Sequence, residues 1–227
     1  MVAGPHFRAG SEGLAFSAKI AVSVLRAAVY IDGFNVYFRL KKTPYKWLDY
    51  RSLVTSLLPA DHDLQILKYF TARINGRFDP DAPTRQDAYL RALQTYIPEM
   101  EIYEGSFLVT TRHARTAADP SKYVEVLHPE EKGSDVNLAV HLLNDAARNA
   151  YDIAFVMSND SDLAEAIRLV SQDHGKKVGL IVPGNRRPAA RLRAVAWPIY
   201  TCRVGRMGQH QLPDPIPGTS IHKPFSW

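Results

Sequence analysis

Four aspartates stand where strands are predicted to end or helices to begin. Asp32 ends an apolar run near the N-terminus, Asp160 and Asp162 follow a second apolar run, and Asp135 lies in the first turn of a predicted helix. Carboxylates that lie close together repel one another unless a cation compensates their charge. Mg²⁺ binds oxygen ligands, usually one or two carboxylates together with water and substrate phosphate. If these strands are neighbours, the four acids predict a metal site able to cleave a phosphodiester.

Two further residues lie beside Asp32. Gly33 lets the backbone approach a metal or a substrate closely, and Asn35 is predicted to orient Asp32 or a metal-bound water by hydrogen bonds. Taken singly, Asp135 and Asp160 are explained more simply as residues that cap helices. Capping explains Asp32 less readily, because this residue directly follows three apolar residues. The presence of all four acids at one predicted edge favours the metal site.

The elements that must position these acids alternate between strands and helices. Strands are predicted for the segments RAAVYIDGF, LQILKYFTAR, MEIYEGSFLVTT, YDIAFVMS and KKVGLIVPG. Helices are predicted for DYRSLVTSLL, APTRQDAYLRALQTYI, SDVNLAVHLLNDAARNA, SDLAEAIRLVSQDHG and RPAARLRAV. This alternation is typical of an α/β fold with a mainly parallel sheet covered on both faces. Ligands of such sheets gather at the carboxyl ends of the strands, where the acids are predicted to lie.

Two local features sharpen this prediction. Residues 112–122 are polar and contain a proline, so a surface loop is expected there, and YVEVLHP after it is read as a short strand or extension. The helix SDVNLAVHLLNDAARNA is expected to take Ser134 as its N-cap. Its apolar face is predicted to contain Val136, Ala139, Val140 and Leu143.

Length and composition indicate one globular domain with extensions. The 227 residues are 46% hydrophobic, which is ordinary for a globular protein. We expect an N-terminal leader over residues 1–25, poorly ordered rather than a signal peptide, a domain over 26–206, and a Pro- and Gly-rich arm over 207–227. No stretch reaches the roughly 18 continuous apolar residues of a membrane span, so no membrane partner is expected. Cys202 is the single cysteine, which excludes a disulfide framework and fits a cytoplasmic location.

The positive charge is concentrated near the C-terminus. The net charge is +5, yet the interval 174–213 carries eight Lys and Arg residues and no acid. Such segregation suggests a polyanionic partner, although a solvated basic face explains charge alone equally well. The residues predicted to hold the phosphates of such a partner follow the last predicted strand and are Arg186, Arg187, Arg191 and Arg193.

Four motifs in order resemble those of one protein family. VYIDGFNVYF, KGSDVNLAVHLL, YDIAFVMSNDSDLAEAI and GKKVGLIVPG resemble the motifs of NYN domains, which belong to the PIN-like nuclease superfamily. The resemblance covers about residues 26–200. The bacterial LabA-like proteins are the most similar subgroup, and the closing IHKPFSW also resembles their tails.

The resemblance implies a Rossmann-like three-layer sandwich whose acidic site binds Mg²⁺ or Mn²⁺ and, in active members, cuts RNA, here expected to be single-stranded. Asp32 resembles the first metal ligand, Asn35 the Asn of the first motif, and Asp135 the middle acid. Asp160 and Asp162 resemble the acidic pair of the third motif. The chain departs from the family where AVAWPIY lacks a further acid that such proteins often carry, so a fifth carboxylate is not expected.

Other functions remain open at this point. A regulator could keep the fold and bind RNA or protein without catalysis, but it would have no need of four clustered acids. Some NYN-like bacterial proteins are named as pyridine-ring hydroxylases, although DGFNVY supplies no G-x-G-x-x-G for a nicotinamide or flavin cofactor. A haloacid-dehalogenase-like phosphatase would need a second Asp at position 34, which is Phe. Tyr37, Phe38, Tyr45 and Trp47 could stack bases, though packing is the more frequent role of such residues. The oligomeric state stays open, a homodimer included.

Overall fold

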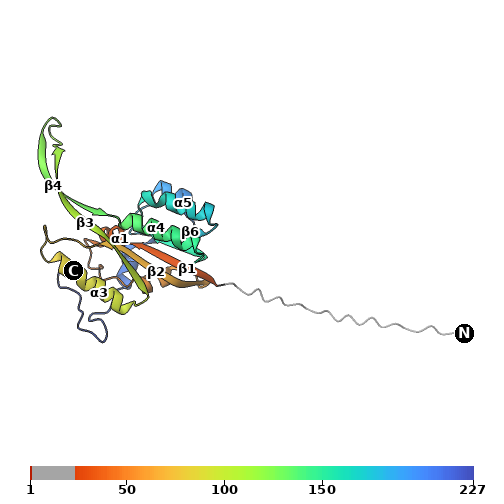
Figure 1. Ribbon diagram of the computed structural model, residues 1–227. Helices are drawn as coiled ribbons and strands as arrows, with labels where there is room; N and C mark the ends of the chain where they lie inside the picture. The colour runs from red at the N-terminus through yellow and green to blue at the C-terminus, as the bar shows by residue number, and fades with distance from the viewer. Residues whose placement is uncertain (2–23) are drawn as a thin grey trace.

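The computed structural model describes residue 1 and residues 24–227 (Figure 1). The leader predicted over residues 1–25 therefore lies, from residue 2 to residue 23, outside the described residues. The strands are β1 (Leu25–Asp32), β2 (His62–Ala72), β3 (Met100–Arg115), β4 (Tyr123–Lys132), β5 (Ile153–Met157), β6 (Lys177–Pro183) and β7 (Ile199–Cys202). The helices are α1 (Gly33–Leu40), α2 (Tyr50–Leu57), α3 (Ala82–Tyr96), α4 (Ser134–Ala147), α5 (Ala164–Asp173), α6 (Ala190–Val195) and α7 (Val204–Gln209), with a 3₁₀ turn η1 (Ser161–Leu163) before α5.

All seven strands form one sheet in the order β4-β3-β2-β1-β5-β6-β7. Every neighbouring pair is parallel except β3 and β4, which are antiparallel. The chain builds outward from β1 to β3 on one side and from β5 to β7 on the other. This reversal makes the carboxyl ends of β1 and β5 the place where doubly wound sheets bind ligands. The predicted α/β fold with a central, mainly parallel sheet is confirmed.

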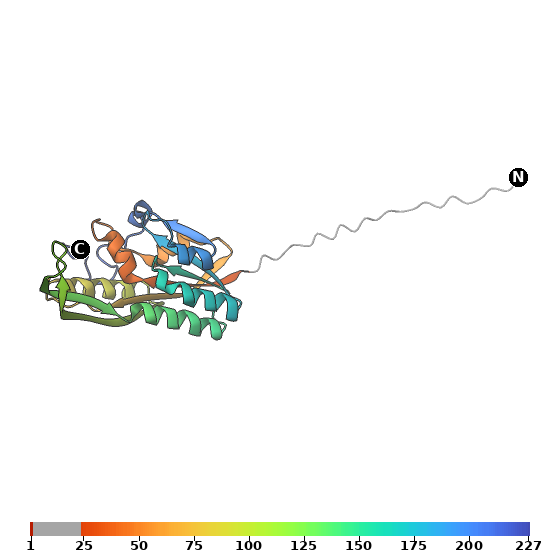
Figure 2. The same ribbon diagram turned by 90° about the horizontal axis from the view of Figure 1, so that it is seen from above.

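Helices cover both faces of the sheet, as Figures 1 and 2 show. Side chains of α1, α2 and α3 pack on one face, and those of α4, α5 and α6 pack on the other. In β1, Val29 and Ile31 belong to the first core and Ala28 and Tyr30 to the second. Because successive residues of a strand point to opposite faces, a strand buried on both faces is apolar throughout. This burial explains why VYI precedes Asp32 without alternation.

The strands β3 and β4 continue past the sheet as a two-stranded ribbon that projects from the domain (Figure 1). Their pairing runs from Ser106 with Lys132 to Arg115 with Tyr123. The surface loop predicted over residues 112–122 is therefore wrong for residues 112–115, which belong to β3. Both faces of the ribbon meet solvent, so its residues need not alternate between apolar and polar, and the period that marks a half-buried strand is missing.

The helix α4 also differs from the prediction. Its N-cap is Gly133, with φ of 91°, and Ser134 is the first helical residue. Val136 and Val140, predicted to face the core, are 60% and 56% exposed. Ala139 and Leu143, also predicted for this face, are partly buried against the second core. The buried residues of the helix are Ser134, Leu138, Leu142, Asp145 and Ala146. Apolar residues surround most of this helix, so their spacing alone did not identify the face that packs on the sheet.

The last residues of the chain pack against the face that carries α1 to α3. Leu212 and Ile216 are buried in the first core, and the Leu212 N–H donates to the Trp47 carbonyl at 2.8 Å. The Trp227 ring contacts those of Trp47 and Tyr89, with centroid distances of 6.3 Å and 4.9 Å. The C-terminal segment thus completes one side of the domain. None of the helices within residues 24–227 is long and apolar enough to cross a membrane.

Replacing Gly33 by alanine is expected to destabilise the fold. A Cβ at this position would lie 2.5 Å from the Tyr69 ring and 2.8 Å from the Phe70 carbonyl oxygen, so α1 would have to move away from β2. Overpacking of this kind typically costs about 1–3 kcal/mol. Gly205→Ala is the matched control, because a Cβ there meets nothing within 4 Å and the residue is helical. Urea unfolding should show a lower midpoint for Gly33→Ala only, and equal midpoints for the two variants would contradict the close packing of Gly33.

Candidate active site

Asp32 lies at the carboxyl end of β1, where the order of the strands reverses. Its Oδ1 accepts a hydrogen bond from the backbone N–H of Asn35 at 2.9 Å and so caps the start of α1. Its Oδ2 accepts a hydrogen bond from the Ser158 hydroxyl at 2.8 Å, one residue beyond β5. The carboxylate therefore bridges the ends of the two central strands.

The surroundings of Asp32 disfavour its ionised form. The pKa of Asp32 is raised to about 6, mainly by burial and to a smaller extent by the charges of Asp160 and Glu131, which together outweigh the hydrogen bonds from Asn35 and Ser158 that lower it. The charges of two further carboxylates thus act on Asp32 at this edge of the sheet. A bound cation would reverse this balance, because it favours the ionised carboxylate.

The two acids that follow β5 point in different directions. Asp160 accepts a hydrogen bond from the Asp162 N–H at 3.0 Å and caps η1, and its own N–H donates to the Ser158 hydroxyl at 3.0 Å. The Asp162 carboxylate is 78% exposed and lies 3.9 Å from the Arg191 guanidinium. Asp160 therefore belongs to the group around Asp32, whereas Asp162 faces the basic helix α6.

Asn35 and Asn159 connect the loops around the acids. The Asn35 side-chain oxygen accepts a hydrogen bond from the Asn159 N–H at 3.3 Å, so Asn35 reaches Asp32 through its backbone and not through its amide. Asn159 in turn donates to the Arg187 carbonyl at 3.1 Å and accepts from the Ala189 N–H at 2.8 Å. These bonds fix the loop that follows β6 beside the end of β5.

Two acids flank the junction of β4 and α4: Glu131 near the end of β4 and the predicted Asp135 in the first turn of α4. Glu131 accepts a hydrogen bond from the Ser134 N–H at 2.9 Å, and its charge acts on Asp32. Asp135 is exposed, and its Oδ1 accepts a hydrogen bond from the Val136 N–H at 2.8 Å. The sequence prediction missed Glu131, although this residue directly precedes the motif KGSDVNLAVHLL, four residues before Asp135.

The donor groups at this edge suit a hard divalent cation. They are oxygens throughout, and each Asp32 oxygen accepts one hydrogen bond and keeps a second lone pair. In the part of the chain that the structure describes, no three His, Cys, Asp or Glu side chains stand close enough together to hold a metal ion. Mg²⁺ commonly takes only one or two carboxylates and completes its shell with water. Asp32 and Asp160 therefore fit Mg²⁺ or Mn²⁺ in their donor chemistry, with Glu131 as the third nearby charge.

The predicted basic residues lie beside the acids in two places. Arg186 and Arg187 are exposed in the loop after β6 and line an open hollow with Arg203, while Arg191 and Arg193 are exposed on α6. The positive charge of Arg186 also acts on Arg39 of α1, whose pKa is lowered first by burial and then by Arg186. The edge of the sheet thus carries a basic surface next to its carboxylates.

Comparisons with known proteins identify the family and support the fold. A family model described as the NYN domain matches residues 26–199. A curated relative, the 6-hydroxy-3-succinoylpyridine 3-monooxygenase HspA of Pseudomonas putida, is 31% identical over 242 residues, which cover 92% of this chain and 77% of the relative. A crystal structure of a protein of unknown function from Vibrio parahaemolyticus matches with a TM-score of 0.52 at 16% identity, over 80% of this chain and 95% of that one. The solved structure supports the fold alone.

Proposed function

The chain belongs to the NYN domain family, and on this premise we propose that it is a divalent-metal-dependent ribonuclease that hydrolyses phosphodiester bonds beside Asp32. The observation that supports this proposal best is the position of Asp32. Its carboxylate is partly buried at the switch point of the sheet, and burial, together with the charges of two further acids, raises its pKa to about 6. Carboxylates of like charge destabilise one another unless a cation compensates them, so their proximity favours a metal site. We further propose that the chain belongs to the LabA-like subgroup of this family. We also propose that it acts in the cytoplasm.

Each residue of the site has a part in this proposal. Asp32 and Asp160 hold the metal, which when bound supplies Lewis-acid activation of water and neutralises charge on the phosphate. Ser158 orients Asp32 by the hydrogen bond to its Oδ2, and Asn35 holds the Asn159 loop in place. The remaining predicted acids, Asp135 and Asp162, are both exposed, and in this proposal they add negative charge near the site.

The direct test is cleavage of a panel of unrelated single-stranded RNAs. Purified protein is incubated with each RNA in Mg²⁺, in Mn²⁺ and in EDTA. The proposal expects cleavage with one or both metals and none in EDTA. Equal cleavage with and without EDTA would reject the metal-dependent mechanism, and intact RNA under every condition would reject the ribonuclease.

The basic loop after β6 gives a second prediction, on RNA affinity. Arg186 and Arg187 are exposed beside the acids and are expected to bind phosphates without regard to sequence. Removing both should reduce the slope of log affinity against log salt by about 1.4, since each phosphate contact on a single strand contributes roughly 0.7. Salt titrations of RNA binding with parent and Arg186→Ala/Arg187→Ala protein measure this slope.

Arg148→Ala/Lys177→Ala is the matched control for that titration. Both residues are exposed, and they lie at the other end of the elements, at the end of α4 and the start of β6. This double variant loses the same charge and should keep the parental slope. If both double variants changed the slope equally, the basic loop would have no special part in RNA binding.

One observation favours a second candidate function. The 31% identical relative is named as a monooxygenase of a hydroxypyridine that carries a succinoyl group. Oxygenation of a hydroxylated aromatic ring is therefore the alternative to RNA hydrolysis. It predicts that the protein consumes O₂ and NADH when given 6-hydroxy-3-succinoylpyridine, and that RNA stays intact. Absence of O₂ consumption with this substrate would exclude it.

A further inference from the structure

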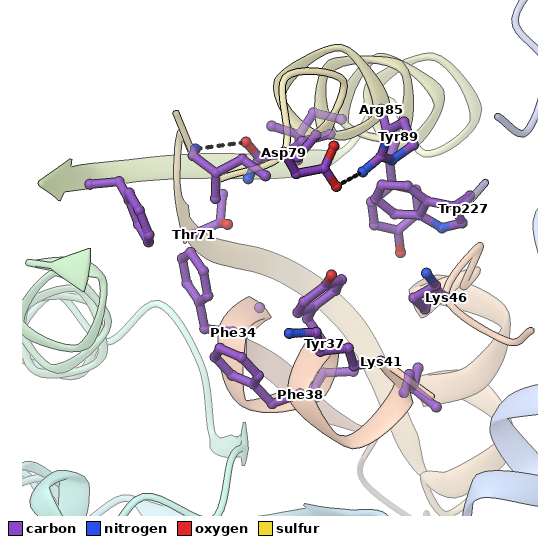
Figure 3. A pocket seen from close by; sticks show the side chains of 18 of the residues that line it. Phe34, Tyr37, Phe38, Lys41, Lys46, Thr71, Asp79, Arg85, Tyr89 and Trp227 are labelled. Carbon is purple, nitrogen blue, oxygen red and sulfur yellow. Dashed lines mark hydrogen bonds and ion pairs between the residues drawn. The ribbon is translucent and has the colours of Figure 1, made fainter. Parts of the chain in front are cut away.

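A cavity of about 320 Å³ lies between α1, the segment that joins β2 to α3, and the C-terminal residue (Figure 3). Gly33, the residue that follows Asp32, is one of the residues that line this cavity, so the cavity adjoins the acidic edge of the sheet. Its volume is at the small end of the range for ligand pockets, enough for one planar ring system with a substituent but not for a folded chain.

Aromatic side chains form one wall of this cavity. Phe34 is stacked on Phe107, with ring centroids 6.4 Å apart and an interplanar angle of 15°, and Phe38 lies 6.2 Å from Phe34 on the same helix. Phe38 and Phe78 also line the cavity and are 60% and 57% exposed. Exposed rings around a cavity offer π-faces to a planar ligand.

Positive charge lies on another side of the cavity. Lys41, Lys46 and Arg85 all line it, and the one acid of the lining, Asp79, is paired with Arg85. The Lys46 amine lies 5.6 Å from the centre of the Trp227 ring and forms no salt bridge within residues 24–227. Burial lowers the pKa of Lys46, and the charges of Arg85, Lys223 and Lys41 lower it further. An anionic group beside Lys46 would relieve this repulsion.

We propose that this cavity binds a planar aromatic ring that carries a negative charge, with the ring against Phe34 and Phe38 and the charge beside Lys46. Two sources supply this chemistry, a nucleotide of an RNA strand and a small free aromatic acid. Binding of the ring requires neither a metal nor hydrolysis at Asp32, so it can be measured separately from the proposed ribonuclease activity.

The experiment is a binding titration in EDTA, followed by calorimetry. The probes are uridine 5′-monophosphate and 6-hydroxynicotinic acid, each compared with a neutral counterpart, uridine and 6-hydroxynicotinamide. At least one anion should bind the parent protein more tightly than its neutral counterpart, by roughly tenfold, because a charge-assisted contact is stronger than a neutral one.

Two variants locate the ligand. Phe38→Ala should weaken binding of the anion by about fivefold or more, since stacking on an aromatic side chain contributes to affinity for any planar ring. Lys46→Gln should abolish the preference for the anion over its neutral counterpart. Tyr123→Ala and Lys122→Gln remove an exposed ring and an exposed amine from the ribbon and should leave both affinities unchanged.

The outcomes separate the two sources. Tighter binding of the nucleotide identifies the cavity as a base subsite for RNA, and tighter binding of the pyridine acid identifies a small-molecule site. Failure of both anions to bind would overturn the proposal, as would equal affinities for anions and neutral counterparts, or unchanged affinities in Phe38→Ala and Lys46→Gln. None of these results depends on RNA cleavage. Failure of the proposed ligand binding can therefore be distinguished from failure of the proposed ribonuclease activity.

Discussion

Asp32→Asn is expected to abolish metal-dependent RNA cleavage while the protein stays folded. The substitution removes the charge that is proposed to hold the metal, yet it keeps the shape of the side chain and an oxygen able to accept the Asn35 N–H. Cleavage should fall by more than about a hundredfold, because losing even an outer partner of a metal ligand typically costs roughly 10–100-fold. Single-turnover cleavage of one RNA with saturating Mg²⁺ or Mn²⁺ measures the effect.

Asp173→Asn is the matched control for this loss. Asp173 is exposed at the end of α5, whereas the start of that helix lies at the acidic edge, so the same change of charge occurs far from the proposed site. This variant should cleave RNA at the parental rate. Parental rates in Asp32→Asn, or equal losses in both variants, would remove Asp32 from the proposed mechanism.

Asp32→Asn is also expected to change the stability of the protein in EDTA. The pKa of Asp32 is about 6 in the folded protein, above the value of about 4 for an unfolded chain. The folded state therefore binds the proton more tightly, and the contribution of Asp32 to stability is lost as pH rises from about 4 to about 6. Asn does not ionise, so above pH 6 Asp32→Asn should be more stable than the parent by on the order of 1–3 kcal/mol. Urea unfolding at pH 4 and pH 7.5 measures this difference.

The sequence predicted the edge of the sheet well because apolar runs and the acids that follow them are local patterns. Asp32 after VYI and Asp160 after AFVM mark strand ends whatever the tertiary contacts are, and the order of the elements then implies a parallel sheet. The family followed from the same motifs. These features depend on a few consecutive residues, so a single sequence is sufficient to predict them.

The features that were missed depend on residues far apart in the chain. The charge of Glu131 acts on Asp32 only because β4 pairs back along β3 and returns to the point where β3 leaves β2, at the carboxyl ends of the parallel strands. A local pattern does not predict this long-range pairing. The helix α1 was not predicted, since Gly33 and Phe34 were taken as the end of the strand RAAVYIDGF and the residues after them were assigned to no element. This helix starts where the Asp32 side chain caps it. Its residues Phe34 and Phe38 form a cavity wall together with Phe107 of β3, which is distant in the sequence and stacks on Phe34. Which face of α4 is buried likewise depends on its partner, the sheet.

Lys68 and Asp145 form a buried ion pair that local patterns also did not predict. They are only 6% and 7% exposed, and the Lys68 amine donates to Asp145 Oδ2 at 2.7 Å. The Tyr30 hydroxyl donates to the same oxygen at 2.7 Å, and burial followed by this hydrogen bond raises the pKa of Tyr30. The pair joins β2 to α4 beneath the second core. One Asp145 oxygen thus satisfies two buried donors at once.

Asp145→Ala is expected to produce the largest loss of stability, about 3–5 kcal/mol, because it leaves the Lys68 charge buried without a close partner. Glu101 is the nearest remaining carboxylate, at 3.9 Å, and its side chain is 53% exposed. Urea unfolding measures the loss, and Glu165→Ala is the control, since it removes a carboxylate that is 60% exposed and paired with Arg168. That control should change stability by less than about 1 kcal/mol.

A double variant, Lys68→Met/Asp145→Leu, distinguishes an unpaired charge from a general loss of packing. It removes both charges and replaces them with apolar side chains of similar size, so it should be more stable than Asp145→Ala despite carrying one substitution more. The remaining deficit relative to the parent should be about 1–3 kcal/mol, because Tyr30 loses the acceptor of its hydroxyl. A double variant less stable than Asp145→Ala would show that the attraction between Lys68 and Asp145 itself stabilises the fold. The buried, unpaired Lys68 charge would then not explain the stability lost in Asp145→Ala.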